Sequence, residues 1–396
     1  MTLRLHKVSK QIDHLQESAV ARAEKLRADL PKVRRALDLA AQRDDLAQKA
    51  KTEAERGWNG AMPACGESIS FRKGAPSAPA ALALVAVDGS QVYPDRHSAS
   101  LFYAINIGHF ILRSDSGETA ADSEPAVFFE DDSLFPEGNL ISNTILNARR
   151  TAEEIAALAR LAAAERAAAP ERPVFALADG GFALRIDEKA FPPAEREALQ
   201  NRFFSAIDSL AAEKIPVAGY IARPGGYPVL ALIDLALDPS PKAGASRGKG
   251  GRSPFPGLDD RVLFETLLAP CERSAVFEFA AYWNDLYRNR EPNQSAHFFY
   301  LNVGRRYPVI ARVEIPEWAA REPALVERVH AALVEQSSVT LNDPYPYALI
   351  RADEEAFVSG EEKQFLEEQM AVALIRGGLR VSRSEKLSHK GRARKH

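Results

Sequence analysis

The sequence has 396 residues, of which 46% are hydrophobic and 27% are charged, and its formal net charge is −3. These values are typical of a soluble globular protein with one large or two ordinary domains. No apolar run approaches the length of a membrane span, and the net charge does not indicate a uniformly basic nucleic-acid binder. The N-terminus lacks the apolar segment of a signal peptide, and the two cysteines form no Cys-x-x-Cys pattern, so we expect a cytoplasmic protein.

The first 79 residues are expected to form a helical arm and a linker. Apolar residues recur at roughly helical spacing between Val8 and Arg56, and the many charged residues among them predict a protruding arm or hairpin outside the core. Pro31 is expected to separate two helices. The stretch from Trp58 to Pro79, rich in Gly, Pro and Ala, is interpreted as a linker to the main domain.

The main domain, residues 80–380, alternates predicted strands and helices. Strands are expected at residues 83–87, 98–112, 173–178, 217–223, 296–303 and 308–315, and helices at 141–169, 194–212, 227–237, 259–268, 324–337 and 361–376. Consecutive strands followed by strand–helix alternation predict an α/β fold with a mixed sheet flanked by helices. A basic, Gly-rich loop at 238–257 and a basic tail at 381–396 complete the chain.

Two of the predicted strands end in an aspartate followed by glycine. The run 83–87 leads into Asp88-Gly89, and the run 173–178 leads into Asp179-Gly180. Glycine allows a sharp turn at a strand end, and ligands of open α/β sheets bind outside such ends. Two carboxylates there would suit a hard divalent cation. The alternative is that each Asp-Gly pair only forms a turn.

The chain resembles the NurA nuclease family through a series of segments in a fixed order, over roughly residues 80–376. The segments are Val87-Asp88-Gly89-Ser90, the helix bearing Arg149 to Glu154, Ala178-Asp179-Gly180, Gly219-Tyr220-Ile221-Ala222-Arg223-Pro224, Asp260-Arg261-Val262-Leu263-Phe264, Ala311-Arg312-Val313-Glu314-Ile315-Pro316, and Tyr345-Pro346-Tyr347-Ala348-Leu349 with Ala352-Asp353. The resemblance implies an RNase H-like core and a manganese-dependent DNA nuclease, with Mg²⁺ as a possible substitute. It also implies a homodimer that processes DNA ends in double-strand break repair beside the hexameric ATPase HerA.

The resemblance further implies a set of site residues. Carried over to this chain, the metal ligands are Asp88, Asp179, Glu154 and Asp353, with Tyr345 as a further catalytic residue. Glu153 remains an alternative to Glu154. Asp353 stands where the family commonly has histidine, a departure that leaves an all-carboxylate cluster and puts any role of a neutral imidazole in doubt. Carboxylate oxygens suit Mg²⁺ and Mn²⁺, and two such ions can activate water and stabilise the leaving oxygen of a phosphodiester.

Basic residues outside this cluster are candidates for contacting DNA. Arg223 follows a predicted strand, and Lys249 and Arg252 lie in the 238–257 loop, where flexible cations can follow a phosphate backbone. The alternative is that all three are solvated loop residues. No Gly-Lys-Ser/Thr follows the glycines, so we expect no ATPase activity. Two rival functions stay open: a non-catalytic DNA-end clamp or regulatory subunit of the ATPase, and an RNA-directed nuclease.

Overall fold

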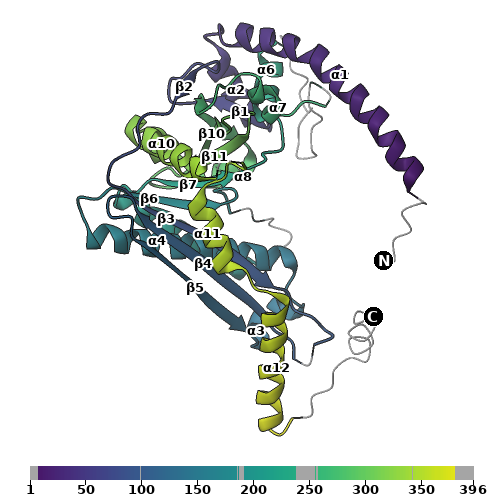
Figure 1. The fold of residues 1–396 in the computed structure, drawn as a ribbon, viewed down its shortest axis with the longest axis vertical. Coiled ribbons are helices and arrows are strands. Elements are labelled where there is room, and N and C mark those ends of the chain that lie inside the picture. Colours follow the sequence, from purple (N-terminus) through teal and green to yellow (C-terminus); the bar gives the residue numbers. More distant parts are fainter. Residues whose placement is uncertain are drawn as a thin grey trace. The chain divides into compact units, whose positions relative to one another are not determined.

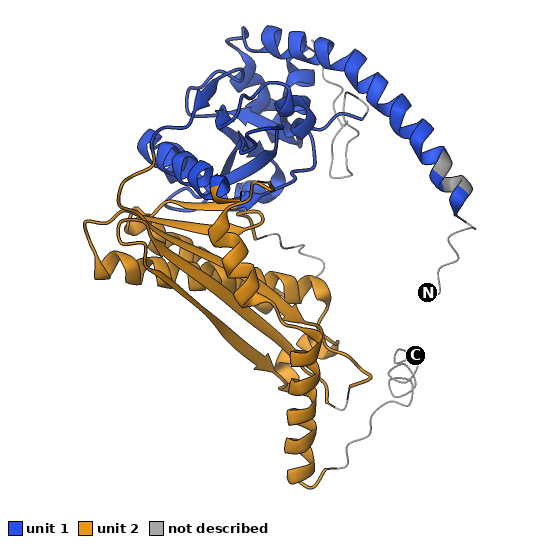
Figure 2. Ribbon diagram, in the orientation of Figure 1, with its two compact units in different colours: residues 1–77, 220–338 blue, residues 78–219, 339–396 orange. Residues whose placement is uncertain are grey.

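The chain folds into two compact units, which Figure 2 shows in different colours. The structure, a computed structural model, describes residues 8–98, 100–184, 186, 191–237, 255, 257–340 and 342–379. Unit 1 combines residues 1–77 with 220–338, and unit 2 combines 78–219 with 339–396. Each unit is therefore built from two separate stretches of the sequence.

Unit 1 is built around antiparallel strands in the order β1–β9–β10–β11, with β8 joining β10 to β2. Its strands are β1 (Gly60–Pro63), β2 (Arg72–Gly74), β8 (Glu272–Ser274), β9 (Phe277–Ala280), β10 (Ala296–Asn302) and β11 (Ile310–Pro316). Its helices are α1 (Ser9–Ala40), α2 (Leu46–Glu55), α6 (Pro228–Leu237), α7 (Asp260–Glu265), α8 (Tyr282–Arg288), α9 (Glu317–Ala320) and α10 (Pro323–Val339). The predicted pairing of the strands at 296–303 and 308–315 is confirmed as β10 and β11.

Three expectations for the N-terminal region were wrong in detail. Pro31 does not separate two helices but lies inside the continuous helix α1 (Figure 1). The second half of α1 and helix α2 supply buried core residues, among them Val33, Leu37 and Ala50, so this part of the arm belongs to the core. Their burial offsets the backbone hydrogen bond that proline removes. The expected linker likewise includes two strands, β1 and β2.

Unit 2 contains a mixed sheet with the strand order β7–β6–β3–β4–β5. Its strands are β3 (Ala83–Val92), β4 (Tyr103–Arg113), β5 (Thr119–Phe128), β6 (Val174–Asp179) and β7 (Val217–Ile221), the last of which ends in unit 1. Its helices are α3 (Asp131–Leu134), the short 3₁₀ turn η2 (Pro136–Gly138), α4 (Asn143–Ala168), α5 (Pro193–Ala212), α11 (Tyr347–Ala356) and α12 (Gly360–Arg376). Strand β3 pairs parallel with β6 and antiparallel with β4. The predicted α/β fold with a mixed sheet and flanking helices is confirmed.

Helices α4 and α11 cover opposite faces of this sheet (Figure 1). A Cβ atom on Gly108, the β4 partner of Asp88, would lie 2.2 Å from the α11 backbone nitrogen of Ala356. A Cβ atom on Gly89 would instead meet Glu154 and Arg150 of α4. Because successive residues of a strand point to opposite faces, α11 lies on the face to which Asp88 points and α4 on the other. In the described part of the chain, no helix is long and apolar enough to cross a membrane.

Candidate active site

The two aspartates predicted at strand ends lie side by side in unit 2. The parallel register pairs Val87 of β3 with Ala178 of β6, so Asp88 and Asp179 follow at neighbouring positions. Each carboxylate accepts a hydrogen bond from the next backbone N–H, at 2.8 Å from Gly89 and 2.9 Å from Gly180. Strand β6 ends at Asp179, whereas β3 continues to Val92 and so extends beyond its pairing with β6.

Helix α4 places a glutamate against this extended part of β3. The helix begins where the Ser142 hydroxyl accepts a hydrogen bond from the Ile145 N–H, and its small alanines allow close packing on the sheet. Glu154 is buried, with 6% of its surface exposed, and its Oε1 would lie 2.5 Å from a Cβ atom on Gly89. Only a glycine at position 89 leaves room for this carboxylate next to Asp88.

Of the two glutamates that the sequence left open, Glu154 is the one that faces the aspartates. Glu153 points away from them, and its Oε2 lies 2.7 Å from the Arg202 Nη2 in an exposed ion pair with helix α5. Successive residues of a helix point about 100° apart, so only one of the two can face the sheet.

Helix α11 brings the fourth carboxylate to the site from the other face of the sheet. It packs closely against Gly108, and its last turn is held by the Asn106 amide, which donates to the carbonyl oxygens of Glu355 and Ala356 at 3.1 and 2.9 Å. This docking places the exposed carboxyl group of Asp353 within hydrogen-bonding reach of Asp88. The departure from histidine therefore adds another acid to the cluster.

Tyr345 also reaches the cluster, just before α11 begins. Its hydroxyl donates to the Oδ1 atom of Asp179 at 2.6 Å. Its backbone is held by the Thr340 hydroxyl, which accepts from the Tyr345 N–H at 3.1 Å and donates to the Tyr345 carbonyl at 3.0 Å. The structure thus brings together all five residues that the resemblance indicated as catalytic.

The clustered acids perturb one another strongly. Burial and the nearby Asp179 and Asp353 carboxyl groups raise the pKa of Asp88 to about 7. Burial also raises the pKa of Glu154 to about 8, although the Arg150 guanidinium opposes the shift. The pKa of Asp179 is also raised, because surrounding protein atoms displace water from its carboxyl group. The hydrogen bond from the Tyr345 hydroxyl opposes this shift, and part of the residue remains exposed to solvent. The group is therefore short of positive charge.

The donor chemistry of this cluster fits a divalent cation. Four carboxyl groups, one each from β3, β6, α4 and α11, supply the hard oxygen ligands that Mg²⁺ and Mn²⁺ prefer. Among the residues that the structure describes, no three His, Cys, Asp or Glu side chains already converge as metal ligands. Because neighbouring carboxylates repel one another, a cation that binds here is expected to draw the side chains together.

Arg150 is a site residue that the sequence did not single out. Its Nη1 donates to the Gly89 carbonyl at 2.7 Å, and its Nε lies 3.4 Å from the Glu154 Oε1. It therefore ties α4 to β3 beside the acids and helps to hold Glu154. The signal that could have identified it is its position four residues before Glu154 on the same helix face.

Of the three predicted DNA-contacting residues, the structure describes Arg223. Arg223 is an exposed residue of unit 1, after strand β7. Lys249 and Arg252 lie outside the described residues, so the structure does not place them.

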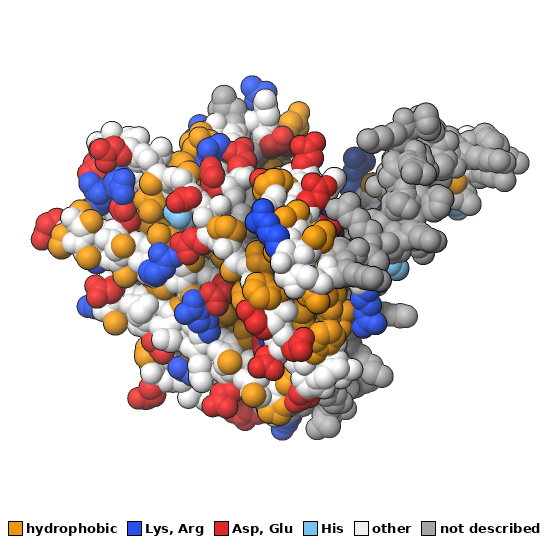
Figure 3. Space-filling model, turned by 90° about the horizontal axis from the view of Figure 1, so that it is seen from below, with side chains coloured by type: hydrophobic (Ala, Val, Ile, Leu, Met, Phe, Trp, Pro, Cys, Tyr) orange, Lys and Arg blue, Asp and Glu red, His pale blue; other side chains and the backbone are white. Residues whose placement is uncertain are grey.

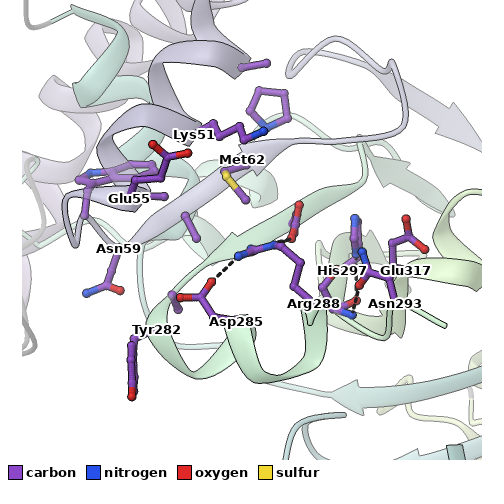
Figure 4. A pocket seen from close by; sticks show the side chains of 18 of the residues that line it. Lys51, Glu55, Asn59, Met62, Tyr282, Asp285, Arg288, Asn293, His297 and Glu317 are labelled. Carbon is purple, nitrogen blue, oxygen red and sulfur yellow. Dashed lines mark hydrogen bonds and ion pairs between the residues drawn. The ribbon is translucent and has the colours of Figure 1, made fainter. Parts of the chain in front are cut away.

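A large cavity of about 1020 Å³ lies in unit 1 and contains none of the clustered acids. Figure 4 shows its walls, which carry Lys51 and Glu55 from α2 and Tyr282, Asp285 and Arg288 from α8. Arg288 pairs with Asp285 and, at 2.7 Å, with Glu278, so much of the charge in this cavity is neutralised within the protein. It lacks the concentration of like charge found around Asp88.

Comparison with models of known protein families identifies the family of this chain. The NurA domain model matches residues 82–358, whereas no curated protein matches the sequence. Among solved structures, the chain is similar to the NurA nuclease from Sulfolobus solfataricus, with 13% identity, 84% of this chain and 92% of that chain covered, and a TM-score of 0.48. It is also similar to a NurA bound to dAMP and manganese, with 13% identity, coverages of 96% and 98%, and a TM-score of 0.39. Because the domain match spans well over half of its length, this chain belongs to the NurA family.

Proposed function

We propose that this protein is a divalent-metal-dependent nuclease that cleaves DNA. The observation that carries the proposal is the meeting of Asp88, Asp179, Glu154 and Asp353 where β3 extends beyond β6 in the unit 2 sheet. A structural role does not explain so many acids with so little compensating positive charge, because each would be destabilising when ionised. The RNase H-like core that the resemblance implies is part of the same proposal.

In this proposal, each residue has a separate task. Asp88 and Asp179 hold the cation, which when bound makes water a stronger nucleophile and stabilises the leaving oxygen. Glu154, fixed by Arg150, adds a third ligand from the opposite face of the sheet. The Tyr345 hydroxyl orients the Asp179 carboxylate. Mn²⁺ is the proposed metal and Mg²⁺ the alternative.

The decisive experiment combines cleavage with metal binding. Labelled single- and double-stranded DNA is incubated with the protein in Mn²⁺, Mg²⁺ or EDTA, and the thermal unfolding of the same protein is followed with and without Mn²⁺. We expect Mn²⁺-dependent cleavage of single strands and of duplex ends from the 5′ side, and a higher melting temperature in Mn²⁺. A rise in melting temperature without cleavage would favour a metal-bound DNA-end clamp. The absence of both cleavage and a rise in melting temperature would refute the proposal.

Asp353 allows a separate test of the ligand set. Asp353→Asn keeps the size of the side chain but removes a charge, so it is expected to raise the Mn²⁺ concentration needed for half-maximal cleavage. Asp353→His is expected to retain function, because imidazole is also a ligand for manganese. An Asp353→Asn protein with an unchanged metal requirement would place this residue outside the ligand set.

We further propose that local basic segments guide DNA to the acids. Acidic, basic and hydrophobic side chains are mixed over the face that Figure 3 shows, so attraction of DNA requires particular segments. Deleting residues 387–396 removes Lys390, Arg392, Arg394 and Lys395. This should flatten the slope of log affinity against log salt by up to about 0.9 per lost phosphate contact on duplex DNA, while cleavage at saturating DNA stays unchanged. An unaltered slope would show that the tail makes no phosphate contacts. The same measurement on Arg223→Ala, Lys249→Ala and Arg252→Ala tests the other predicted DNA contacts.

The proposed partner is a HerA-type hexameric ATPase, acting with a homodimer of this chain. The first half of α1 offers the docking surface, since Ile12, Leu15 and Val20 are all more than half exposed. Because Val33 and Leu37 belong to the unit 1 core, a truncation should stop before them. Removal of residues 1–28 is expected to weaken co-purification with the ATPase while leaving DNA cleavage by the isolated protein unchanged. Undiminished co-purification would show that the first half of α1 is not the docking surface for the ATPase.

A further inference from the structure

The part of β3 that extends beyond β6 carries polar and aromatic residues on the side of helix α4. Gly89, Gln91 and Tyr93 follow one another at every second position, so they share the face of the strand on which α4 lies. Gly89 lies against Glu154 of the acid cluster. Tyr93 comes four residues later, roughly 13 Å farther along an extended chain. The acids and this tyrosine are therefore separated along one continuous surface of unit 2.

Tyr93 is held in one orientation although it is exposed. Its hydroxyl donates to the Asn147 Oδ1 at 2.8 Å, and the Gln91 Nε2 donates to the Tyr93 hydroxyl at 2.8 Å and to the same Asn147 oxygen at 3.1 Å. Pro94 follows and restricts the Tyr93 backbone to an extended conformation. With 37% of the residue in solvent, this fixed ring can receive a ligand at little cost in conformational entropy.

Helix α4 connects this ring to the acids through a positive charge. Asn147, Arg150 and Glu154 are spaced by three and four residues, so they lie on one face of the helix. Arg150 stands between the other two, and its side chain is 29% exposed. From Glu154 to Tyr93 the surface thus presents a proposed metal ligand, a guanidinium and an aromatic ring. Positive charge combined with an exposed aromatic ring is typical of sites that bind single-stranded nucleic acid.

We propose that Tyr93 is a base-stacking platform for single-stranded DNA, with Arg150 facing the phosphate backbone between this ring and the acids. Because the ring is far from Asp88 along β3, the stacked base belongs to a nucleotide beyond the cleaved bond. The Gln91 Oε1, which is buried and accepts no hydrogen bond from the described residues, is an acceptor beside that base. The inference rests on the proposed function, since it assigns a place to the substrate strand, but stacking can be measured without cleavage.

Substitutions at position 93 separate stacking from a structural role of the hydroxyl. Binding of labelled single-stranded oligo(dA) is measured by fluorescence anisotropy in EDTA, in the Asp88→Asn protein, so that metal-dependent cleavage does not occur. Tyr93→Ala should weaken binding about tenfold, because one stacked base is lost, whereas Tyr93→Phe keeps the ring and should bind almost as well as the parent. Tyr307→Ala, which removes a 79% exposed tyrosine of unit 1, is the matched control and should bind like the parent. Equal losses in Tyr93→Ala and Tyr93→Phe, or no loss in Tyr93→Ala, would overturn the proposal.

A fluorescent base tests stacking directly. Oligonucleotides that carry 2-aminopurine at successive positions are bound to the same proteins, because stacking on an aromatic ring quenches the fluorescence of this base. Quenching should be confined to a few adjacent positions with tyrosine or phenylalanine at position 93 and should be absent in Tyr93→Ala. Quenching that persists in Tyr93→Ala would overturn the proposal. Cleavage by the wild type combined with unchanged DNA affinity in Tyr93→Ala would refute the platform and leave the nuclease, whereas a loss of affinity in Tyr93→Ala without any cleavage by the wild type would do the reverse.

Discussion

Each unit of the protein contains a group of acids, some of them buried, and the two groups differ in what balances them. In unit 1, fully buried Asp260 accepts hydrogen bonds from the backbone of Val229 and Leu230 and from the Tyr300 hydroxyl, at 2.8, 2.9 and 2.9 Å. Nearby, Glu314 forms a buried ion pair with Arg312 at 2.8 Å. The protein itself supplies the partners of these acids.

In unit 2 the balance is different. Among the described residues, Arg150 forms an ion pair with Glu154 of the cluster that also contains Asp88, Asp179 and Asp353. Burial raises the pKa of Asp260 and of Asp88 alike, to about 7, but the hydrogen-bond donors of Asp260 oppose its shift, whereas the Asp179 and Asp353 carboxyl groups add to that of Asp88. Burial also raises the pKa of Glu154 to about 8. A paired group such as that of unit 1 is explained by folding alone, whereas the underpaired group of unit 2 is the one that we propose to bind a cation.

The largest expected effect is the loss of DNA cleavage when an aspartate of the unit 2 group is substituted. Asp88→Asn or Asp179→Asn removes a proposed metal ligand, and the loss of several kcal/mol of transition-state stabilisation should lower the cleavage rate by a factor on the order of a thousand. In EDTA, the same substitutions should leave the free energy of unfolding unchanged or raise it, because they relieve repulsion. Glu153→Gln, on the same helix but paired with Arg202, is the matched control and should stay active. Activity above a few per cent in either aspartate variant contradicts the assignment.

The second prediction reverses the pattern in unit 1. Arg312→Met removes the ion pair between Arg312 and buried Glu314, and with it a guanidinium that lies 5.4 Å from the centre of the Phe279 ring. Breaking one side of a buried pair costs roughly 3–5 kcal/mol. Urea unfolding should therefore show a lower stability in EDTA and in Mn²⁺ alike, with the same stabilisation by Mn²⁺ as in the wild type. A change of less than about 1 kcal/mol would show that this group is not a structural counterpart of the acid cluster.

The contrast also explains what the sequence could predict. The buried strands before Asp88 and Asp179, and the long helix bearing Glu154, follow from apolar runs and alanine content, and these patterns predicted the centre of unit 2. Helix α11 was missed because Pro346 obscures its start, although Ala348, Leu349, Ala352 and Ala356 follow a helical period. Strand β5 was missed because it lies at the sheet edge, where charged residues and Pro125 interrupt any alternation.

Other features depend on contacts between distant parts of the chain. The choice of Glu154 over Glu153 is determined by the face of α4 that meets Gly89, and the position of Asp353 by the docking of α11 on Gly108. Neither contact has a local sequence signal. The division of the chain into two units, each assembled from separate stretches, is likewise invisible to composition and periodicity. These features are tertiary, and single-sequence patterns report mainly local structure.

The third prediction tests whether close packing at Gly89 places the glutamate. In Gly89→Ala, the new Cβ atom would lie 2.5 Å from the Glu154 Oε1 and 3.0 Å from the Arg150 Cγ, so both flexible side chains must move. Displacing a ligand by about 1 Å can cost up to roughly a hundredfold in rate. We expect a ten- to hundredfold slower cleavage at saturating Mn²⁺, on the order of 1.4 to 2.7 kcal/mol, with little loss of stability. Gly360→Ala, at a position with no atoms within 4 Å of the new Cβ, should behave as the wild type.

The smallest effect is expected for Tyr345→Phe, which keeps the ring but removes the hydroxyl that donates to Asp179. Asp179 retains its place at the end of β6 and its bond from the Gly180 N–H, so the ligand is less well oriented but still present. One hydrogen bond to a charged group contributes about 1.5 kcal/mol, which corresponds to a roughly tenfold change. We expect the Mn²⁺ concentration for half-maximal cleavage to rise by about this factor, while the maximal rate at saturating Mn²⁺ is retained. If the maximal rate falls instead and the metal requirement is unchanged, Tyr345 acts on the DNA and not on the ligand. In that case the hydroxyl belongs to the substrate side of the site, and the acids of unit 2 keep their cation without its help.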